Sequence, residues 1–455
     1  MIIQSVNPAT EVVIQEYNTL SEVNTIAVVD KAYFAFTSWR NTEFSVRRQL
    51  MLNLSELLLL KIDELSVLIT NEMGKPVTQA RAEIEKCALV CQHYAELAEK
   101  YLKPRAIKTE MAKTKVCYQA LGVIFGIMPW NFPFWQVFRF AAPTIMAGNA
   151  VILKHAPISI GAGNAIAALF IEAGFPTHLF QHAILNNDMA AFVIAHEKVA
   201  ALSFTGSEKT GRIVSALAAS HLKKSVLELG GSDPYMVLAD ADIELAARSI
   251  VTSRLTNCGQ VCIAAKRIIV LESVHDELIK KISTYMGDYK MGDPLNPKAT
   301  LGPMARFDLR EVLHQQVIES VEKGAILLSG GRMVDRQGFY YPPTLLTNVC
   351  KGMPAFDEEL FGPVIAIIKV HSEDEAIALA NASNFGLAAA VFTSDLIRGE
   401  EIATHKIEAG SCFVNAVVAS DPRVPFGGIK HSGYGRELSR EGILEFVNTK
   451  TVAIK

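Results

Sequence analysis

The sequence predicts an α/β protein built from more than one domain. Its 455 residues exceed the roughly 100 to 200 residues of one ordinary domain, so two or three domains are expected. Short apolar runs alternate with longer helical segments along most of the chain, a pattern typical of parallel sheets covered by helices on both faces. Glycine and proline separate these segments, and we find no repeat of fixed length.

The first half of the chain predicts helices followed by one parallel sheet. Apolar residues recur at helical spacing over 45–69 and over 77–100, with the break MGKP (73–76) between them, which predicts two helices. A further helix is expected over 162–172. Apolar runs of strand length predict strands at 123–128, 150–153, 179–184, 199–204 and 225–229.

The second half predicts another α/β unit and a projecting element. Strands are expected at 235–238, 267–271, 325–328, 364–370, 388–392 and 411–414. The polar, alternating segment 103–118 and the tail 445–455 predict strands that leave the main body, where such strands often pair subunits. We therefore expect one domain from 1–102 and 120–230, a second from 231–432, and a β element from 103–119 and 433–455.

Composition excludes several classes of protein. Half of the residues are hydrophobic and the net charge is -3, so no basic surplus favours nucleic acid. The N-terminal residues lack the pattern of a signal peptide, and no apolar run reaches the ~18 residues of a membrane span. A cytoplasmic protein is expected. Its seven cysteines are scattered and odd in number, which argues against a disulfide framework and leaves thiols available for chemistry.

Cys262 is the candidate nucleophile. It follows a glycine turn in NCGQVC (257–262), where a thiol could be exposed. With an ordinary pKa of about 8.5 a thiol is mostly protonated at neutral pH, so a working nucleophile needs help from nearby donors or a base. An arbitrary cysteine is more often a small buried hydrophobic residue, so this assignment depends on its context.

Two further segments supply that context. Glu228 ends an expected strand in LELGGS (227–232), at the sheet edge where α/β proteins bind ligands, and could act as a general base. Asn131 in MPWNFP (128–133) is held between prolines and aromatic residues, as suits a donor to an oxyanion. Taken alone, Glu228 could be a solvated strand-end carboxylate, and Asn131 could cap the next helix.

A third segment, FTGSEKTG (204–211), is a strand, a glycine turn and a helix start whose N–H groups could face a pyrophosphate. It is not the GxGxxG fingerprint of dinucleotide-binding proteins. The segment ELFGP (359–363) has no meaning that spacing alone reveals.

In their order and separations these segments resemble the aldehyde dehydrogenase superfamily. The similarity extends over the chain, from NPAT (7–10) to PFGG (425–428) and SGYGRE (432–437). It implies an aldehyde dehydrogenase-like fold with a Rossmann-type cofactor domain (1–102 and 120–230), a catalytic domain (231–432) and a small β oligomerisation element, in a homodimer or homotetramer. No metal is implied.

The resemblance also assigns roles. Cys262 is implied as the nucleophile, Glu228 as the base for thioester hydrolysis, and the Asn131 amide with the Cys262 N–H as the oxyanion hole. The implied cofactor-binding residues are Trp130, Lys154, Gly206, Ser207, Glu359 and Phe361. A nicotinamide cofactor must accept the hydride, because no side chain can.

A finer resemblance is to bacterial succinate-semialdehyde dehydrogenases. It rests on the segments NFPFWQVFR (131–139), KHAP (154–157), GGSDP (230–234) and MARFD (304–308). Arg139 stands where related enzymes hold the far carboxylate of the substrate, which suits a bidentate guanidinium, although a surface ion pair at a helix end is the alternative. Further substrate contacts are expected at Trp135, Ser420, Arg254 and Arg423.

Three positions refine the expected activity. Pro157 replaces the glutamate that NAD-preferring relatives often carry to bind the ribose 2′-hydroxyl, so NADP is favoured while NAD remains allowed. Ala264 excludes a second cysteine two residues after the nucleophile, but a Cys258–Cys262 crosslink stays open, although consecutive helical turns would orient the sulfurs poorly. Other semialdehydes such as glutarate semialdehyde, a CoA-acylating enzyme and a non-enzymatic role are the rivals, and Glu228 disfavours the last two.

Overall fold

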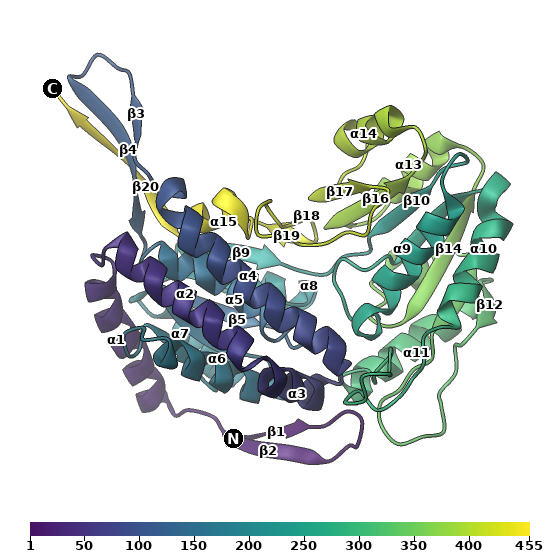
Figure 1. Ribbon diagram of the computed structural model, residues 1–455, viewed down its shortest axis with the longest axis horizontal. Helices are drawn as coiled ribbons and strands as arrows, with labels where there is room; N and C mark the ends of the chain where they lie inside the picture. Colours follow the sequence, from purple (N-terminus) through teal and green to yellow (C-terminus); the bar gives the residue numbers. More distant parts are fainter.

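The computed structural model describes all 455 residues and has three main sheets (Figure 1). A hairpin, β1 (Ile2–Val6) with β2 (Val13–Asn18), is followed by helices at Glu22–Trp39 (α1), Phe44–Leu60 (α2), Ile62–Met73 (α3) and Val77–Tyr101 (α4). The single helix expected over 45–69 is wrong. Lys61 leaves helical geometry, with φ -99° and ψ 14°, and the acidic residues Asp63 and Glu64 favour a new helix N-terminus there.

The first large sheet has six strands in the order β19-β9-β8-β5-β6-β7. Its strands are β5 (Val123–Met128), β6 (Ala150–His155), β7 (Phe180–His182), β8 (Val199–Thr205), β9 (Lys224–Glu228) and β19 (Gly433–Tyr434). The first five run parallel, and β19 is antiparallel to β9. Nearly every residue of β5 and β8 is buried, and because successive side chains point to opposite faces, both faces must be covered.

Helices join these strands in alternation. They span Trp135–Met146 (α5), Ile160–Glu172 (α6), Asn187–Ala195 (α7) and Glu208–Ser220 (α8). Helix α1 packs against β6, while α5 packs against β5 and β6. All five strands and the helix expected in this part of the sequence are therefore present, with ends that shift by one or two residues.

The second large sheet has seven strands in the order β12-β13-β14-β11-β10-β16-β17. They are β10 (Pro234–Val237), β11 (Arg267–Leu271), β12 (Ile326–Ser329), β13 (Thr344–Thr347), β14 (Val364–Val370), β16 (Ala388–Phe392) and β17 (Ser411–Val414). All neighbours are parallel except β12 and β13. The sequence missed β13, a four-residue strand directly after two prolines.

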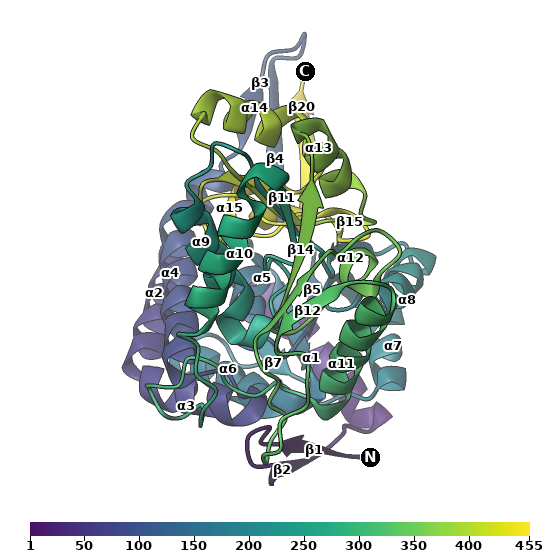
Figure 2. The ribbon, with the colours of Figure 1, turned by 90° about the vertical axis from the view of Figure 1, so that its right-hand side faces the viewer.

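The helices of this second unit pack around its own core. They are α9 (Ile243–Leu255), α10 (Glu272–Met286), α11 (Phe307–Glu322), α12 (Pro354–Asp357), α13 (Glu373–Asn381) and α14 (Leu396–His405). Their buried apolar residues and those of the sheet form one cluster, separate from the cluster around the first sheet. Figure 2 shows this unit facing the viewer.

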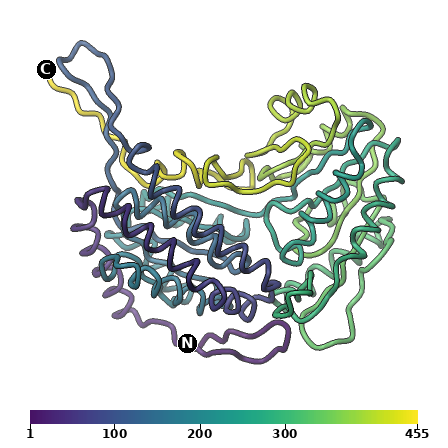
Figure 3. The backbone as a smooth tube through the Cα atoms, in the orientation of Figure 1, coloured from purple at the N-terminus to yellow at the C-terminus, as the bar shows by residue number.

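A third sheet projects from the body, as the sequence predicted. It pairs β4 (Lys113–Ala120) with β3 (Arg105–Ile107) on one side and β20 (Val447–Ile454) on the other. Figure 3 traces the chain to its C-terminus at the tip of this sheet. The segment 433–455 was expected to belong wholly to this element, but Gly433–Tyr434 instead adds a strand to the six-stranded sheet by pairing with Leu227 and Glu228. The division into domains stays a prediction.

None of the helices combines the length and the apolar character needed to cross a membrane. The α/β architecture with two parallel sheets is confirmed. Strands β9, β8 and β5 are neighbours and run parallel, so the residues that follow their carboxyl ends meet at one sheet edge.

Candidate active site

The carboxyl ends of β5, β8 and β9 bring together three of the predicted segments. Ile127 pairs in register with Phe204, and Thr205 with Glu228, so Asn131, Gly206 and Glu228 all lie at or just beyond this edge. Residues distant in sequence thus converge through strand register alone.

Cys262 reaches the same edge from the second unit. It follows α9 and a short 3-10 turn, in which Asn257, Cys258 and Gly259 have φ of 52°, 54° and 71°. A Cβ on Gly259 would collide with the carbonyl group of Gly362, so only glycine fits there. The expectation that Cys258 and Cys262 occupy consecutive turns of a helix is wrong, because α9 ends at Leu255, before either cysteine, and Cys258 itself has a left-handed backbone.

Side-chain amides join the loops of Asn131 and Cys262. The Asn257 side chain donates to the Asn131 carbonyl oxygen at 2.8 Å, and the Asn131 side chain donates to the Gln260 carbonyl oxygen at 3.0 Å. The Asn131 amide therefore keeps one N–H uncommitted, and the Cys262 N–H makes no hydrogen bond within the protein. Asn131 does not cap a helix, since α5 begins after Phe134 without a side-chain cap.

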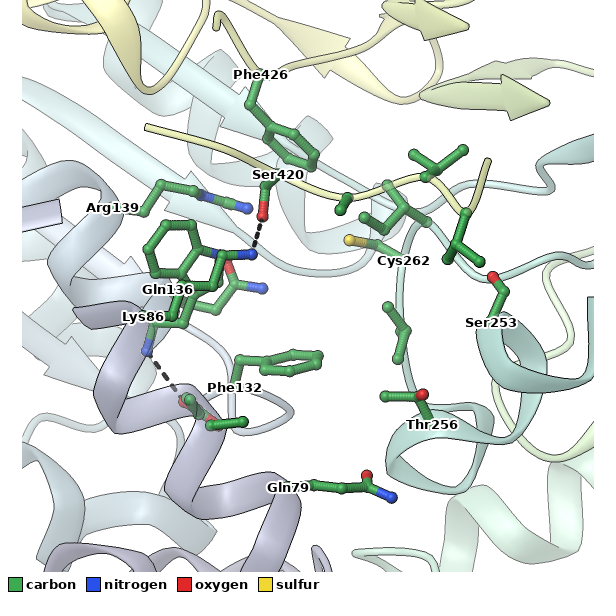
Figure 4. Close-up of a pocket in the computed structure, with 18 residues that line it drawn as sticks. Gln79, Lys86, Phe132, Gln136, Arg139, Ser253, Thr256, Cys262, Ser420 and Phe426 are labelled. Carbon is green, nitrogen blue, oxygen red and sulfur yellow. Dashed lines mark hydrogen bonds between the residues drawn. The ribbon is translucent and has the colours of Figure 1, made fainter. Parts of the chain in front are cut away.

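Cys262 lies where two cavities meet. One cavity, of about 290 Å³, and another, of about 390 Å³, both have Cys262 and Gln136 in their walls. Figure 4 shows the first, with Cys262 facing it from one side and Arg139, Lys86 and Gln136 on the other. A ligand in each cavity would therefore approach the same sulfur.

The first cavity, termed here the aldehyde cavity, is mainly apolar. Its walls include three of the predicted substrate contacts, Trp135, Arg139 and Ser420. They also include Lys86 and Phe132, which the sequence analysis did not single out. An apolar cavity with a few polar groups is the usual form of a small-molecule site.

Arg139 is buried beside this cavity and forms an ion pair with Glu437. The surface ion pair considered as its alternative role is therefore wrong, because both side chains lie in the interior. The ring of Phe426 lies 4.6 Å from the Arg139 guanidinium, and Nη2 of Arg139 has no hydrogen-bond partner. The guanidinium thus retains donor capacity towards a ligand.

The other two expected arginines do not reach the aldehyde cavity. Arg254 is fully buried, and its guanidinium donates to the carbonyl oxygens of Val364 at 2.5 Å and Leu360 at 2.6 Å. It ties α9 to the β14 region, so its assignment as a substrate contact is corrected. Arg423 is exposed and pairs with Asp421 at 2.6 Å.

The second cavity, termed the cofactor cavity, collects most of the predicted cofactor residues. Trp130, Gly206, Ser207, Glu359 and Phe361 line it, together with Asn131. The rings of Trp130 and Phe361 meet edge to face at 5.8 Å. Lys154 is not in its wall; it lies near the end of β6, the strand next to β5, mostly buried, and burial lowers its pKa.

The residues of this cavity fit a nicotinamide dinucleotide. Gly206 and Ser207 precede α8, where backbone N–H groups and the helix dipole favour phosphate. Oε1 of Glu359 accepts a hydrogen bond from the Gly231 N–H at 3.1 Å and forms an ion pair with Lys266 at 3.1 Å, which leaves Oε2 without a partner. A ribose hydroxyl could donate to that oxygen.

Burial governs the protonation of Cys262 and Glu228. It raises the pKa of the Cys262 thiol to about 11, while the charges of Arg139 and Lys266 oppose the rise and those of Glu228 and Glu359 add to it. Burial likewise raises the pKa of Glu228 well above its usual value, and nearby Arg139 lowers it in part. Both Glu228 oxygens are buried and lack hydrogen-bond partners, and Glu228 lies at the sheet edge beside Leu229 and Gly230 without being in the wall of either cavity.

Cys258 lies apart from this chemistry. Its side chain is 1% exposed, and burial raises its pKa to about 12. Such a thiol is a poor nucleophile.

Sequence reasoning missed Lys86, Gln136, Lys266 and Glu437. Lys86 belongs to a helix whose other charged residues, apart from Glu83, are exposed, so its spacing gives no sign of a cavity. Lys266 lies four residues after Cys262, and Glu437 is the last residue of SGYGRE. Neither position by itself indicates what the side chain does.

Comparisons with known proteins agree with this site. The model of the aldehyde dehydrogenase family matches residues 1–452. The chain is 45% identical to a probable succinate-semialdehyde dehydrogenase [NADP(+)] of Synechocystis sp., over all of both chains. It is 44% identical to a succinate semialdehyde dehydrogenase [NAD(P)+] of Escherichia coli, covering 98% of this chain and 97% of that one.

A solved structure is similar throughout. The crystal structure of succinic semialdehyde dehydrogenase from Streptococcus pyogenes, in complex with NADP+ as the cofactor, has a TM-score of 0.97 and 35% identity over 99% of each chain. The fold expected from the resemblance is therefore confirmed. With a family match that spans the chain and a cysteine placed between two cavities, this protein belongs to the aldehyde dehydrogenase family.

Proposed function

We propose that the chain oxidises succinate semialdehyde to succinate, with NADP favoured over NAD as the hydride acceptor. The observation that carries the proposal is the position of Cys262 in the walls of both the aldehyde cavity and the cofactor cavity. A substrate carbon bonded to that sulfur would face the second cavity directly.

The first step is addition of the Cys262 thiolate to the aldehyde carbon. The carbonyl oxygen becomes an oxyanion, and two N–H groups are available to it, from the Asn131 amide and the Cys262 backbone. Arg139 and Lys266 favour the thiolate by charge, which partly offsets its burial. The product of this step is a tetrahedral thiohemiacetal.

A nicotinamide dinucleotide held by Trp130, Gly206, Ser207 and Glu359 would supply the hydride acceptor, and loss of a hydride from the thiohemiacetal carbon would leave a thioester on Cys262. Glu228 then takes a proton from water, whose oxygen attacks the thioester carbon. The C–S bond breaks, the acid leaves, and the thiol is restored. Burial raises the pKa of Glu228, which makes its carboxylate a stronger base towards water than an exposed carboxylate is.

The choice of substrate is supported by the cationic end of the aldehyde cavity. Arg139 is buried there with an unpartnered Nη2, and Ser420 offers a hydroxyl. The names of the Synechocystis, Escherichia coli and Streptococcus pyogenes relatives support the same substrate. Glutarate semialdehyde, with one more methylene, is the second candidate because the cavity wall is mainly apolar around this cationic end.

The preference for NADP is supported by Pro157. This residue is exposed just beyond β6, and it places no carboxylate near a ribose 2′-phosphate. We expect kcat/KM for NADP to exceed that for NAD, and Pro157→Glu to lower the value for NADP more than that for NAD. A wild-type preference for NAD would overturn the cofactor assignment.

The test of the proposed reaction is turnover of succinate semialdehyde, followed by reduction of NADP and by release of free succinate. Cys262→Ala should abolish turnover, and Arg139→Ala should raise KM for succinate semialdehyde. Adding CoA should neither accelerate the reaction nor divert the product to a CoA ester. If CoA is required, or if apolar aldehydes are better substrates, the proposal is wrong.

We also infer that the protein forms a homodimer or homotetramer through the projecting sheet. Strand β20 has eight residues at an edge of this sheet, and most of them are exposed. A long open edge of this kind is normally covered. Light scattering should give at least two subunits per particle, and a monomer at micromolar concentration would refute the inference.

A further inference from the structure

A second cation faces the aldehyde cavity beside Arg139. Lys86, in α4, has its ammonium group 2.8 Å from the hydroxyl of Ser420 and 4.3 Å from the centre of the Trp135 ring. All three residues line the cavity, and Figure 4 shows the hydrogen bond as a dashed line reaching Ser420. The ammonium is therefore held at the cavity wall rather than in solvent.

Lys86 has no carboxylate partner. It takes part in no ion pair, and the serine hydroxyl satisfies only one of the three N–H groups of an ammonium. Contact with the indole face compensates its lost hydration only in part. An unpaired charge in a largely buried place is costly, so this position favours an incoming anion.

The nearby acidic groups are committed elsewhere. Glu83, also in the cavity wall, pairs with Lys75 and accepts the N–H groups of Phe134 at 2.9 Å and Trp135 at 3.0 Å. Asp421 pairs with Arg423 at 2.6 Å. Lys86 is thus the charged residue of the cavity wall that remains without a counterion.

The closeness of Lys86 and Arg139 makes the binding of an anion between them more favourable. Burial lowers the pKa of Lys86 to about 8, and the positive charge of Arg139 lowers it further, while Cys87, Asp421 and Glu83 act in the opposite direction. Arg139 also influences the pKa of Cys262, so it lies within electrostatic range of both groups. A single substrate molecule could therefore place its carboxylate near Arg139 and Lys86 and its aldehyde group at Cys262.

We propose that Lys86 and Ser420 complete a carboxylate subsite with Arg139, and that Lys86 determines the preference for acidic aldehydes. The ammonium and the serine hydroxyl hold one face of the substrate carboxylate while the guanidinium holds the other. This inference rests on the proposed function. It adds a residue from α4, a helix of the first unit that contributes no catalytic group.

The experiment compares succinate semialdehyde with butanal, which has the same four-carbon chain without the carboxylate. Lys86→Met should lower the ratio of kcat/KM for succinate semialdehyde to that for butanal by about 10- to 100-fold, as expected for losing a charged hydrogen bond. The loss should lie mainly in KM. Lys86→Arg should restore much of the ratio, because it keeps the charge.

Lys100→Met, an exposed lysine on the same helix, is the matched control and should leave both substrates unaffected. Ser420→Ala should weaken the preference less than Lys86→Met. Competition by succinate against butanal gives a second measurement, and Lys86→Gln should weaken it if Lys86→Met folds poorly.

The outcomes separate this inference from the proposed function. If wild type prefers succinate semialdehyde and both Lys86 variants keep that preference, the role of Lys86 is refuted and the proposed function stands. If wild type prefers butanal and succinate does not compete, both are wrong. A loss of the preference that arginine restores supports the subsite.

Discussion

Lys266 connects the nucleophile to the cofactor cavity by a contact with Glu359. Its ammonium lies 3.1 Å from Oε1 of Glu359 and donates to the carbonyl oxygen of Cys262 at 2.5 Å and to that of Val261 at 3.0 Å. One side chain therefore orients the glutamate predicted to bind a ribose and also fixes the backbone that carries the sulfur.

Lys266→Met should affect both ends of this connection. Removing the ammonium takes away one of the two cations that favour the Cys262 thiolate, so the pKa of the thiol should rise further. It also frees Glu359, so KM for the cofactor should rise. The pH dependence of alkylation by iodoacetamide and steady-state kinetics measure the two effects. The exposed Lys351→Met is the control, and an unchanged alkylation profile would contradict the electrostatic role.

Glu228→Gln should separate the two halves of the reaction. Glutamine cannot accept the proton of water, so kcat should fall by about 10²- to 10⁴-fold while the first turnover still produces a burst of reduced cofactor. Rapid mixing with absorbance detection would record the burst. The exposed Glu322→Gln should behave as wild type. Absence of a burst would mean that Glu228 acts before the thioester forms.

The same carboxyl group sets the pH dependence. Burial raises the pKa of Glu228, and a base works only when deprotonated, so the rate of thioester hydrolysis should rise with pH through that raised pKa and fall below it. The acid limb of the kcat profile should therefore lie above the ordinary range for glutamate. Glu228→Gln should remove this limb. A limb that persists in the variant would assign it to another group.

Asn131→Ala tests the oxyanion hole. One N–H of the Asn131 amide is committed to the Gln260 carbonyl oxygen, and the other is available to the developing negative charge. Loss of such a donor should lower kcat by about 10²- to 10³-fold, with a smaller change in KM. The variant keeps the hydrogen bond from the Asn257 side chain to the backbone carbonyl oxygen of residue 131, and circular dichroism should show that its fold is preserved. An unchanged kcat with a rise in KM would indicate a role in ground-state binding only.

The buried ion pair of Lys75 and Glu83 supports the Asn131 loop. Both side chains are fully buried, Lys75 lies 3.7 Å from the centre of the Phe132 ring, and Glu83 accepts two N–H groups at the start of α5. Lys75→Met should cost about 3–5 kcal/mol of unfolding free energy, because it leaves a buried carboxylate without its cation. Urea titration measures the loss. Lys61→Met, which breaks the solvent-exposed pair with Glu172, should change stability little.

The sequence predicted most of the sheet structure because local periodicity was strong. The strands at Val123–Met128, Arg267–Leu271 and Val364–Val370 were expected with the observed ends. The break at Lys61 was missed because the apolar spacing continues through it, and Thr344–Thr347 because the two prolines directly before it are typical of a turn rather than a strand. Local sequence patterns thus predict the presence of helices and strands well, but they predict the breaks within them poorly.

The site was predicted less evenly. Cys262, Asn131 and Glu228 were singled out because each lies next to glycines or prolines that set a special backbone, and the structure brings all three to one sheet edge. Arg254 was misassigned because a cation near the nucleophile in sequence points instead to the carbonyl groups of β14 and its neighbours. Lys86 was invisible, because its contact with Ser420 spans 334 residues.

The position of Cys262 in the walls of both cavities also bears on the order in which the two ligands bind and leave. The aldehyde cavity and the cofactor cavity are bounded by different residues apart from Cys262 and Gln136, so a ligand in one cavity leaves most of the wall of the other uncovered. An acid formed at the sulfur would lie in the aldehyde cavity, whose wall shares only Cys262 and Gln136 with the wall around the dinucleotide. Release of the acid and exchange of the dinucleotide therefore need not wait for each other.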